Sequence, residues 1–394
     1  MKKFLYPADI LMPKCDLSKW SVIACDQYTS DKLYWDRVKA FVGDNPSALN
    51  LILPEIYLDE SEERLDKINK TMKEYLDENV FETVSSSMIY VERKFSNDKI
   101  RHGIVGMINL EDYDYKKGSC SLVRATEETV IERIPPRVKI RKDAYLELPH
   151  VLLFIDDPDN TVFDSVKNSI SNFVKAYDFN LMENAGAIKG YYINENTQDL
   201  INKKLGLLVK DGLLFAVGDG NHSLASAKEC YNINNTEKSK FALVEVVNIH
   251  DLSIEFEPIY RVLFGVNKNE LIDEMNNYFK NISNETKHTF EICDKDGSNS
   301  ISFSAISKLP VGTLQTFLDD YLKKNPNVKI DYIHGINETK ELCKEDNTVG
   351  FIFDGMKKSE LFDAVSLDGS LPRKTFSMGT ADEKRFYLEG RKIK

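Results

Sequence analysis

Short apolar runs and helical repeats of apolar residues follow one another along the chain. Residues 213–217 form an uninterrupted apolar run, which predicts a buried strand, and residues 224–229 predict a helix. The six residues between them are all glycine or polar: Gly218, Asp219, Gly220, Asn221, His222 and Ser223. A strand, a glycine-containing polar turn and a helix therefore follow in order, and the predicted chemistry of the chain is organised around this turn.

The same patterns predict further elements along the chain. Apolar or alternating runs predict strands at residues 21–25, 88–92, 104–110, 151–155, 186–193, 241–249, 330–333 and 350–353. Apolar residues at helical spacing predict helices at residues 34–41, 65–76, 161–177, 197–205, 314–322 and 338–343. This mixture of strands and helices indicates an α+β protein with mixed sheets.

A change of composition after Gly265 predicts two domains. Residues 267–300 are rich in Asn, Lys, Asp and Ser, unlike the more apolar stretch before them. We expect residues 1–265 to form the domain that carries the site. Residues 266–394 should form a smaller α/β domain, whose basic stretch at 371–380 returns towards the site.

Composition and charge narrow the classes of partner. The chain has 394 residues, 42% of them hydrophobic and 29% charged, as in ordinary globular proteins. Its net charge of −11 argues against nonspecific binding to nucleic acid or to an anionic membrane. No apolar run approaches the roughly 20 residues of a membrane helix, the first residues do not resemble a signal peptide, and the six cysteines are dispersed. We expect a cytoplasmic protein with a small-molecule ligand, and leave homo-oligomerisation open.

The turn at residues 218–223 has the composition of an anion site. Glycines before a helix allow backbone N–H groups and the helix N-terminus to face an anion. Asp219, His222 and Ser223 add a carboxylate, an imidazole and a hydroxyl at the same place. The structural alternative is that Asp219 or Asn221 only caps the helix.

An arginine-rich stretch supplies a second candidate. Residues 122–141 alternate arginines and glutamates, and the prolines at 135 and 136 forbid one continuous helix through it. Arg124 or Arg133 could hold a phosphate with two hydrogen bonds, with Glu127 close by in the sequence. The alternative is a surface ladder of ion pairs, which contributes little to stability.

Three more positions are judged from their surroundings in the sequence. Asp26 and Tyr28 follow the predicted strand at 21–25, and the end of a strand is a common place for ligands in α/β proteins. Cys25 has no adjacent basic residue, which favours an inert thiol over a nucleophile. His150 stands alone before an apolar strand and is interpreted as a core histidine.

Six ordered motifs resemble domain-of-unknown-function family 1015: RATEET at 124–129, IPPRV at 134–138, ELPH at 147–150, GDGNHS at 218–223, FEPIYR at 256–261 and LPRK at 371–374. The turn and its helix are more distantly similar to the phosphate-binding loop of the ParB/sulfiredoxin superfamily. Members of that superfamily bind or hydrolyse nucleotides, and some are free-serine kinases. This chain departs from the superfamily pattern, because Asn221 replaces a histidine and Ser223 replaces an arginine. The resemblance implies a ParB/sulfiredoxin-like site whose missing positive charge comes from Arg124 or Arg133.

The leading hypothesis is nucleotide-dependent phosphoryl transfer to a small hydroxylated metabolite such as serine. This chemistry needs donors that orient phosphates, positive charge, and a group that positions the attacking hydroxyl. The predicted ligands of the phosphates of ATP or ADP are Gly218, Gly220, Asn221, Ser223, Arg124 and Arg133. Asp219 or Glu127 binds Mg²⁺ or acts as the base, with Asp219 as the metal ligand, and His222 donates to a phosphate oxygen.

Asp26 and Tyr28 are predicted to shape the acceptor pocket. Two alternatives remain open at the same site. One is a phosphomonoester hydrolase, and the other is a non-catalytic sensor of a nucleotide or phosphorylated metabolite.

Overall fold

The computed structural model describes residues 2–394, apart from the side chains of Asp59, Ser61 and Arg133. The chain divides into two compact units, which we call the first and the second unit. The first unit comprises Met1–Ala125, Thr129–Ile254 and Thr380–Lys394, and the second comprises Thr126–Glu128 and Glu255–Gly379. The predicted domains at 1–265 and 266–394 stay predictions as folding units, while the contacts group residues 380–394 with the first unit.

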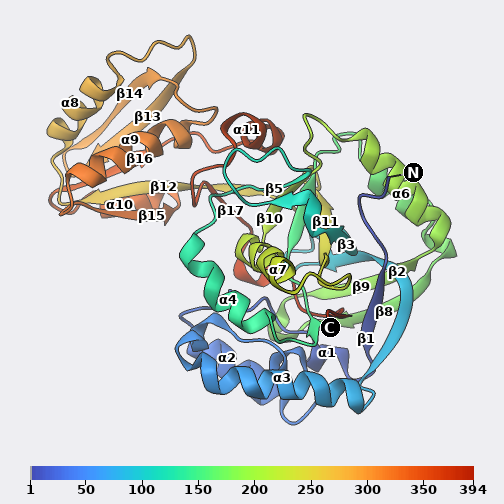
Figure 1. The fold of residues 1–394 in the computed structure, drawn as a ribbon. Coiled ribbons are helices and arrows are strands. Elements are labelled where there is room, and N and C mark those ends of the chain that lie inside the picture. The colour runs from blue at the N-terminus through green and yellow to red at the C-terminus, as the bar shows by residue number, and fades with distance from the viewer. Residues whose placement is uncertain (1) are drawn as a thin grey trace. The chain divides into compact units, whose positions relative to one another are not determined.

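A ten-stranded sheet forms the centre of the first unit (Figure 1). Its strands, in spatial order, are β4 (Tyr113–Asp114), β5 (Val123–Ala125), β10 (Phe215–Asp219), β7 (Leu152–Ile155), β11 (Phe241–Asn248), β3 (Ile100–Asn109), β2 (Phe81–Lys94), β9 (Ala187–Ile193) and β8 (Val174–Asn180), with β1 (Ala8–Pro13) paired to β2. β10 runs parallel to β5, and β11 runs parallel to β7, whereas β3 is antiparallel to β11. The sheet is therefore mixed, which confirms the predicted α+β class.

Helices cover both faces of this sheet. They are α1 (Leu17–Trp20), α2 (Lys32–Val42), α3 (Ser61–Asp77), α4 (Ile134–Arg141), α5 (Thr161–Lys167), α6 (Glu195–Leu207) and α7 (Asn221–Asn234). The short strands β6 (Leu146–Glu147) and β18 (Arg391–Lys392) pair with each other, and α4 packs against α7. Pro135 and Pro136 lie in the first turn of α4, where a missing N–H costs nothing.

The two cores follow from the alternation of side chains along the strands. Ile89 and Val91 of β2 lie in the cluster that includes α2 and α3. Met88 and Tyr90, which alternate with them along the strand, lie in the cluster on the other face, with residues of α5, α6 and α7. A period of two therefore divides one apolar strand between two cores, because both faces of the sheet are covered.

Most predicted elements are confirmed, and two are wrong. The strands at 88–92, 104–110, 186–193 and 241–249 correspond to β2, β3, β9 and β11. The predicted helix at 161–177 ends as α5 at Lys167, and β8 occupies the end of that stretch as an edge strand with Val174 70% exposed. Residues 21–25 form only an isolated bridge, between Ile23 and Phe386, because the segment turns away before a ladder is built.

The second unit contains an antiparallel sheet. Its strands are β14 (Gly297–Ser304), β13 (Lys287–Asp294), β16 (Thr348–Ile352), β12 (Phe256–Phe264) and β15 (Lys329–His334), and β17 (Phe376–Met378) also pairs with β12. Its helices are α8 (Lys268–Phe279), α9 (Pro310–Lys324), α10 (Ile336–Leu342) and α11 (Leu361–Asp368). The segment Thr126–Glu128 joins this unit through Leu371, whose N–H donates to the carbonyl of Thr126 at 2.7 Å.

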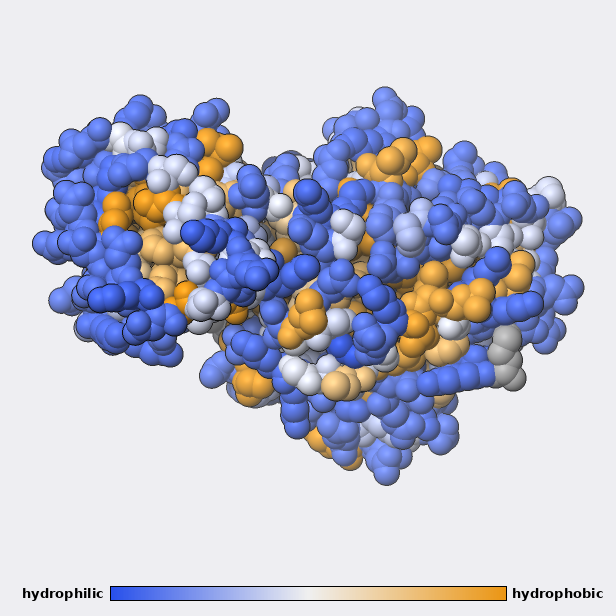
Figure 2. All heavy atoms as spheres, turned by 90° about the horizontal axis from the view of Figure 1, so that it is seen from above, coloured by the Kyte–Doolittle hydropathy of each residue, from blue (hydrophilic) through white to orange (hydrophobic). Residues whose placement is uncertain are grey.

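The visible surface in Figure 2 is mainly hydrophilic, with hydrophobic residues scattered over it. Among the described helices, none combines the length and the apolar character that a membrane crossing requires.

Candidate functional site

The predicted strand, turn and helix are β10, Gly220 and α7 (Figure 1). Gly220 is the N-cap residue of α7 with φ of +80°, and no side chain caps the helix. Asp219 instead accepts a hydrogen bond from the N–H of Gly220 at 2.9 Å. The capping alternative is therefore wrong, and the helix keeps the uncapped first turn that favours an anion.

The two glycines of the turn are required by the surrounding fold. A Cβ on Gly220 would lie 3.0 Å from Cγ2 of Val151, and one on Gly218 would lie 2.5 Å from the ring of Phe154. Gly220 also has a backbone conformation that other residues adopt only with strain. These glycines allow β10 and α7 to pack against the start of β7, and this packing fixes the position of Asp219.

Lys384 brings two carboxylates into one electrostatic cluster. Its Nζ lies 3.4 Å from Oδ2 of Asp219, and the two side chains are only 16% and 17% exposed. Lys384 also acts on Asp26, whose Oδ2 lies 4.0 Å from Nε2 of His150. Burial alone raises the pKa of Asp26, but His150, the Gln27 amide and Lys384 outweigh burial and lower that pKa below its ordinary value. Asp26 is therefore ionised at neutral pH.

A chain of hydrogen bonds orients His150. The hydroxyl of Tyr387 lies 2.7 Å from Nδ1 of His150, and the N–H of Cys25 donates to the same hydroxyl oxygen at 3.3 Å. If Tyr387 donates its proton to Nδ1, the neutral ring carries its own proton on Nε2, which faces Asp26. With Tyr387 as the donor, the tautomer of His150 complements the carboxylate of Asp26.

Cys25 lines the same region, but its environment keeps the thiol protonated. Burial, followed by the charge of Asp26, raises the pKa of Cys25 to about 12. Since the thiolate is the reactive form, an unreactive Cys25 is the expected consequence.

Two buried polar atoms mark the place where a ligand would complete the turn. Within the described part of the chain, Oδ1 of Asn221 and Oγ1 of Thr129 have no hydrogen-bond partner. The next residue, Val130, donates its N–H to Nε2 of His222 at 3.3 Å, which places the proton of a neutral His222 ring on Nδ1. Buried polar atoms are normally paired, so this corner suits a ligand or an ordered water.

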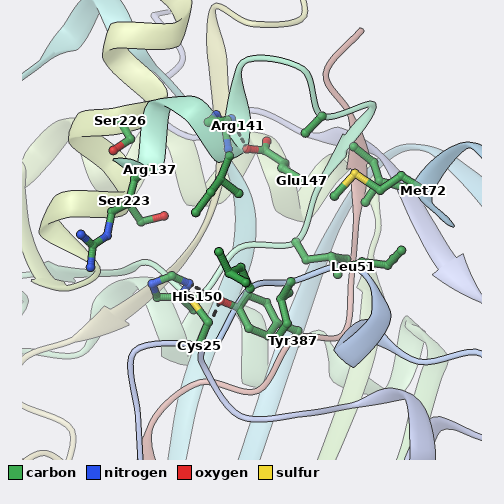
Figure 3. A pocket seen from close by; sticks show the side chains of 16 residues that line it. Cys25, Leu51, Met72, Arg137, Arg141, Glu147, His150, Ser223, Ser226 and Tyr387 are labelled. Carbon is green, nitrogen blue, oxygen red and sulfur yellow. Dashed lines mark hydrogen bonds and ion pairs between the residues drawn. The ribbon is translucent and has the colours of Figure 1, made fainter. Parts of the chain in front are cut away.

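A pocket of about 130 Å³ opens beside the turn (Figure 3). Arg137 of α4 and Ser223 of α7 lie on one side of it, and Leu51 and Met72 lie on the opposite side. Arg137 forms an ion pair with Glu55. The pocket therefore combines a polar side next to the first turn of α7 with an apolar side.

Three other predicted residues lie away from the turn or outside the described side chains. The guanidinium of Arg124 donates to the carbonyls of Ser121 and Asp211, both at 2.9 Å. Asp211 precedes β10 and the turn follows it, so Arg124 points to the opposite end of the strand. The side chain of Arg133 lies outside the described residues, and Glu127 belongs to the second unit.

Tyr28 stacks on Tyr34, with ring centroids 3.8 Å apart. Its backbone carbonyl accepts from the indole of Trp35 at 3.2 Å, so these contacts fix Tyr28 against α2. Its role at the acceptor pocket stays a prediction.

The structure adds three residues that the sequence interpretation did not place in the site: Lys384, His150 and Arg137. His150 and Arg137 belong to the motifs ELPH and IPPRV, which carry a signal in the sequence. The sequence favours a core role for His150 and leaves phosphate binding and ion pairing open for the stretch that contains Arg137. Lys384 had no signal, because it belongs to no motif and contacts the turn only through the fold.

The carboxylates do not form a metal site by themselves. Among residues 2–394, no group of three or more His, Cys, Asp or Glu side chains has the arrangement to hold a metal ion. Asp219 already faces the N–H of Gly220 and the ammonium of Lys384. Mg²⁺ usually needs one or two carboxylates and phosphates from a substrate, so any Mg²⁺ here would depend on the ligand.

Residues 5–321 match the model of a family described as a protein of unknown function, DUF1015, and the chain belongs to this family. A search of curated proteins found no match to the chain.

Several solved structures are distantly similar. A free serine kinase variant in complex with ADP shares 10% identity, covering 75% of this chain and 93% of the other, with a TM-score of 0.42. A conserved hypothetical protein from Pyrococcus furiosus shares 10% identity, covering 73% and 95%, with a TM-score of 0.39. SbnI with a C-terminal truncation from Staphylococcus aureus shares 11% identity, covering 72% and 85%, with a TM-score of 0.38. Similarities of this size do not carry an argument about function.

Proposed function

We propose that the protein transfers a phosphoryl group from a nucleotide to a small hydroxylated metabolite at the N-terminus of α7. The observation that carries the proposal is the position of Lys384 beside Asp219, at the uncapped start of a helix, together with its effect on Asp26. Phosphoryl transfer depends mainly on positioning and on neutralising charge, and this cluster provides both.

Each group has a role in this proposal. The first turn of α7 and the hydroxyl of Ser223 bind phosphate oxygens, and Lys384 neutralises charge that develops during transfer. Asp26, held ionised near His150, accepts a hydrogen bond from the attacking hydroxyl. Asp219 holds Lys384 in place and is an alternative base.

The proposal retains the finer expectations from the sequence. It treats the turn as a ParB/sulfiredoxin-like phosphate loop in a cytoplasmic protein, with ATP or ADP as donor. Mg²⁺ would accompany the nucleotide phosphates, and no step above depends on it. Arg137, which lies beside Ser223 in the pocket, takes the place proposed for Arg124 and Arg133 as the arginine near the phosphate.

A product assay tests the proposal. Purified protein is incubated with ATP or ADP and a panel of hydroxylated metabolites, and phosphorylated products are measured with and without Mg²⁺. We expect Lys384→Met to lower turnover by about 100-fold or more, as for other lost transition-state donors. Lys392→Met, an exposed lysine in the same C-terminal segment, is the matched control and should leave turnover unchanged.

Three results would count against the proposal. Phosphate release from a monoester without nucleotide would indicate a hydrolase. Ligand-dependent thermal stabilisation without product would indicate a sensor. Equal turnover in Lys384→Met and the control would remove Lys384 from the mechanism.

A further inference from the structure

We propose that the pocket beside the turn binds the apolar group of the acceptor, so that the acceptor is an amphipathic metabolite. It would carry one phosphorylatable or anionic end and a branched or ring-sized apolar end. This inference rests on the proposed function and narrows its substrate class, because serine has no such group.

The size of the pocket is the first argument. Its volume is about 130 Å³. A buried apolar cavity of about 150 Å³ is known to stay dry and to bind benzene. A group near the size of one aromatic ring or one branched aliphatic side chain therefore fits, and a hydroxymethyl group would leave most of the space empty.

The second argument is the apolar character of the side chains that line the pocket, which we call its wall. Aliphatic side chains from separate segments line the pocket: Leu51, Ile52, Leu53, Met72, Ile140, Ala144, Leu146 and Leu148. Leu51, Leu53 and Met72 belong to the buried core cluster and are at most 5% exposed. These residues are fixed by packing, so the apolar surface is part of the rigid fold.

Two polar groups that line the pocket, Glu147 and Ser226, are already bonded within the protein. Glu147 accepts from Arg141, from Nε of Arg391 at 2.8 Å and from the N–H of Leu243 at 3.0 Å. The hydroxyl of Ser226 donates to the carbonyl of His222 at 2.7 Å. A purine base would bury ring nitrogens against this wall without new partners, which is costly. The wall therefore favours a hydrocarbon group over a nucleotide base.

The polar side of the pocket fixes the direction of the ligand. Arg137, Ser223 and His150 lie on the side next to the turn (Figure 3). Ser223 lines the pocket from the first turn of α7. An anionic or phosphorylated end at this side and an apolar end towards Leu51 and Met72 satisfy both surfaces.

Isothermal titration with matched probe pairs tests the inference. The first pair is phenyl phosphate and inorganic phosphate, and the second is AMP and ribose 5-phosphate. We expect phenyl phosphate to bind at least about tenfold more tightly than phosphate, from burial of the ring. We expect AMP and ribose 5-phosphate to bind within about threefold of each other, since the base gains no pocket contacts.

Pocket-filling variants locate the effect. Ile52→Phe and Leu148→Phe place a ring in the pocket and should remove the preference for phenyl phosphate. Ile56→Phe, half-buried in the same cluster but outside the pocket, is the matched control and should keep it. Thermal unfolding checks that each variant is folded. If a variant does not fold, the comparison of probes on the unmodified protein still tests the inference.

The outcomes separate this inference from the proposed function. Equal binding of phenyl phosphate and phosphate would overturn the apolar pocket and leave phosphoryl transfer standing. A preference for AMP that Ile52→Phe removes would assign the pocket to the nucleotide base and overturn the inference. Binding of none of the four probes would overturn both.

Discussion

Two adjacent cations, Lys384 and Arg385, belong to two polar clusters of the first unit that differ in burial and pairing. Arg385 is 4% exposed and donates to Glu245 at 2.8 Å and to Glu389 at 2.7 Å. Lys384 is partly exposed and lies 3.4 Å from Asp219. The Arg385 cluster is held by short internal hydrogen bonds, although Oε1 of Glu245 has no hydrogen-bond partner among the described residues. The Lys384 cluster has a longer contact, which a ligand can join.

This difference separates charge used for folding from charge available for chemistry. Glu389 also accepts from the hydroxyl of Tyr177 at 2.5 Å, so the Arg385 cluster has its bonds within the protein. Such a network is costly to break and does not respond to a ligand. The Lys384 cluster lies beside an uncapped helix N-terminus, a position that favours negative charge.

The largest expected effect is the loss of stability in Arg385→Met. Removing this guanidinium leaves the carboxylates of Glu245 and Glu389 buried without their main cation. We expect unfolding free energy to fall by about 3–5 kcal/mol, the range for breaking a buried pair. Urea unfolding measures it, and Lys384→Met should cost less, because Lys384 has one longer ion pair where Arg385 has two short ones. Equal losses in the two variants would show that the clusters do not differ as described.

The next effect is on turnover. Asp219→Asn keeps the shape of the turn but removes the charge that faces Lys384. We expect kcat to fall by about 100-fold, because Lys384 loses the carboxylate that holds it beside the turn, with a much smaller change in ligand affinity. Asp211→Asn, an exposed carboxylate before the same strand, is the control and should leave kcat unchanged. A normal kcat in Asp219→Asn would remove this carboxylate from the chemistry.

Local patterns predicted the scaffold of the site better than its side-chain contacts. The apolar run at 213–217 and the glycine-containing turn predicted β10 and α7, because strand, turn and helix signals are local. Arg124 illustrates the limit. Its place in a charged stretch suggested a phosphate ligand, yet two backbone carbonyls take its guanidinium. Which end of a strand a long side chain reaches is decided by tertiary contacts.

Lys384 and His150 show the same limit in the other direction. Lys384 meets Asp219 across 165 residues of sequence, and no local pattern carries such a pairing. His150 is indeed buried, as expected of a core histidine, but its two ring nitrogens face Tyr387 and Asp26. His150 can therefore be buried and still make polar contacts, because Tyr387 and Asp26 face its two ring nitrogens.

Gly220→Ala should have a smaller effect than either charge variant. A Cβ there would lie 3.0 Å from Cγ2 of Val151, and φ is +80°. We expect a loss of about 1–3 kcal/mol in unfolding free energy, from strain and crowding together. Gly118→Ala is the matched control, because φ is +77° and no atom lies within 4 Å of the added Cβ. It should show only the conformational cost of about 1 kcal/mol. An equal loss in both variants would show that contact with Val151 does not constrain Gly220.

The smallest expected effect is a pH dependence that depends on Asp26. Its folded-state pKa lies below the ordinary value of 3.8, since His150, the Gln27 amide and Lys384 outweigh burial. A carboxyl with a depressed folded pKa contributes stability that is fully present above its unfolded pKa. That contribution is lost as the pH falls below 3.8 and through the folded pKa.

The stability difference between the unmodified protein and Asp26→Asn should therefore be constant from about pH 5 to 7 and shrink below 3.8. Urea unfolding across this range measures it, with Asp36→Asn, an exposed carboxyl, as the control. A difference that grows on acidification would reverse the assigned shift and remove Asp26 from the group of ionised carboxylates around Lys384.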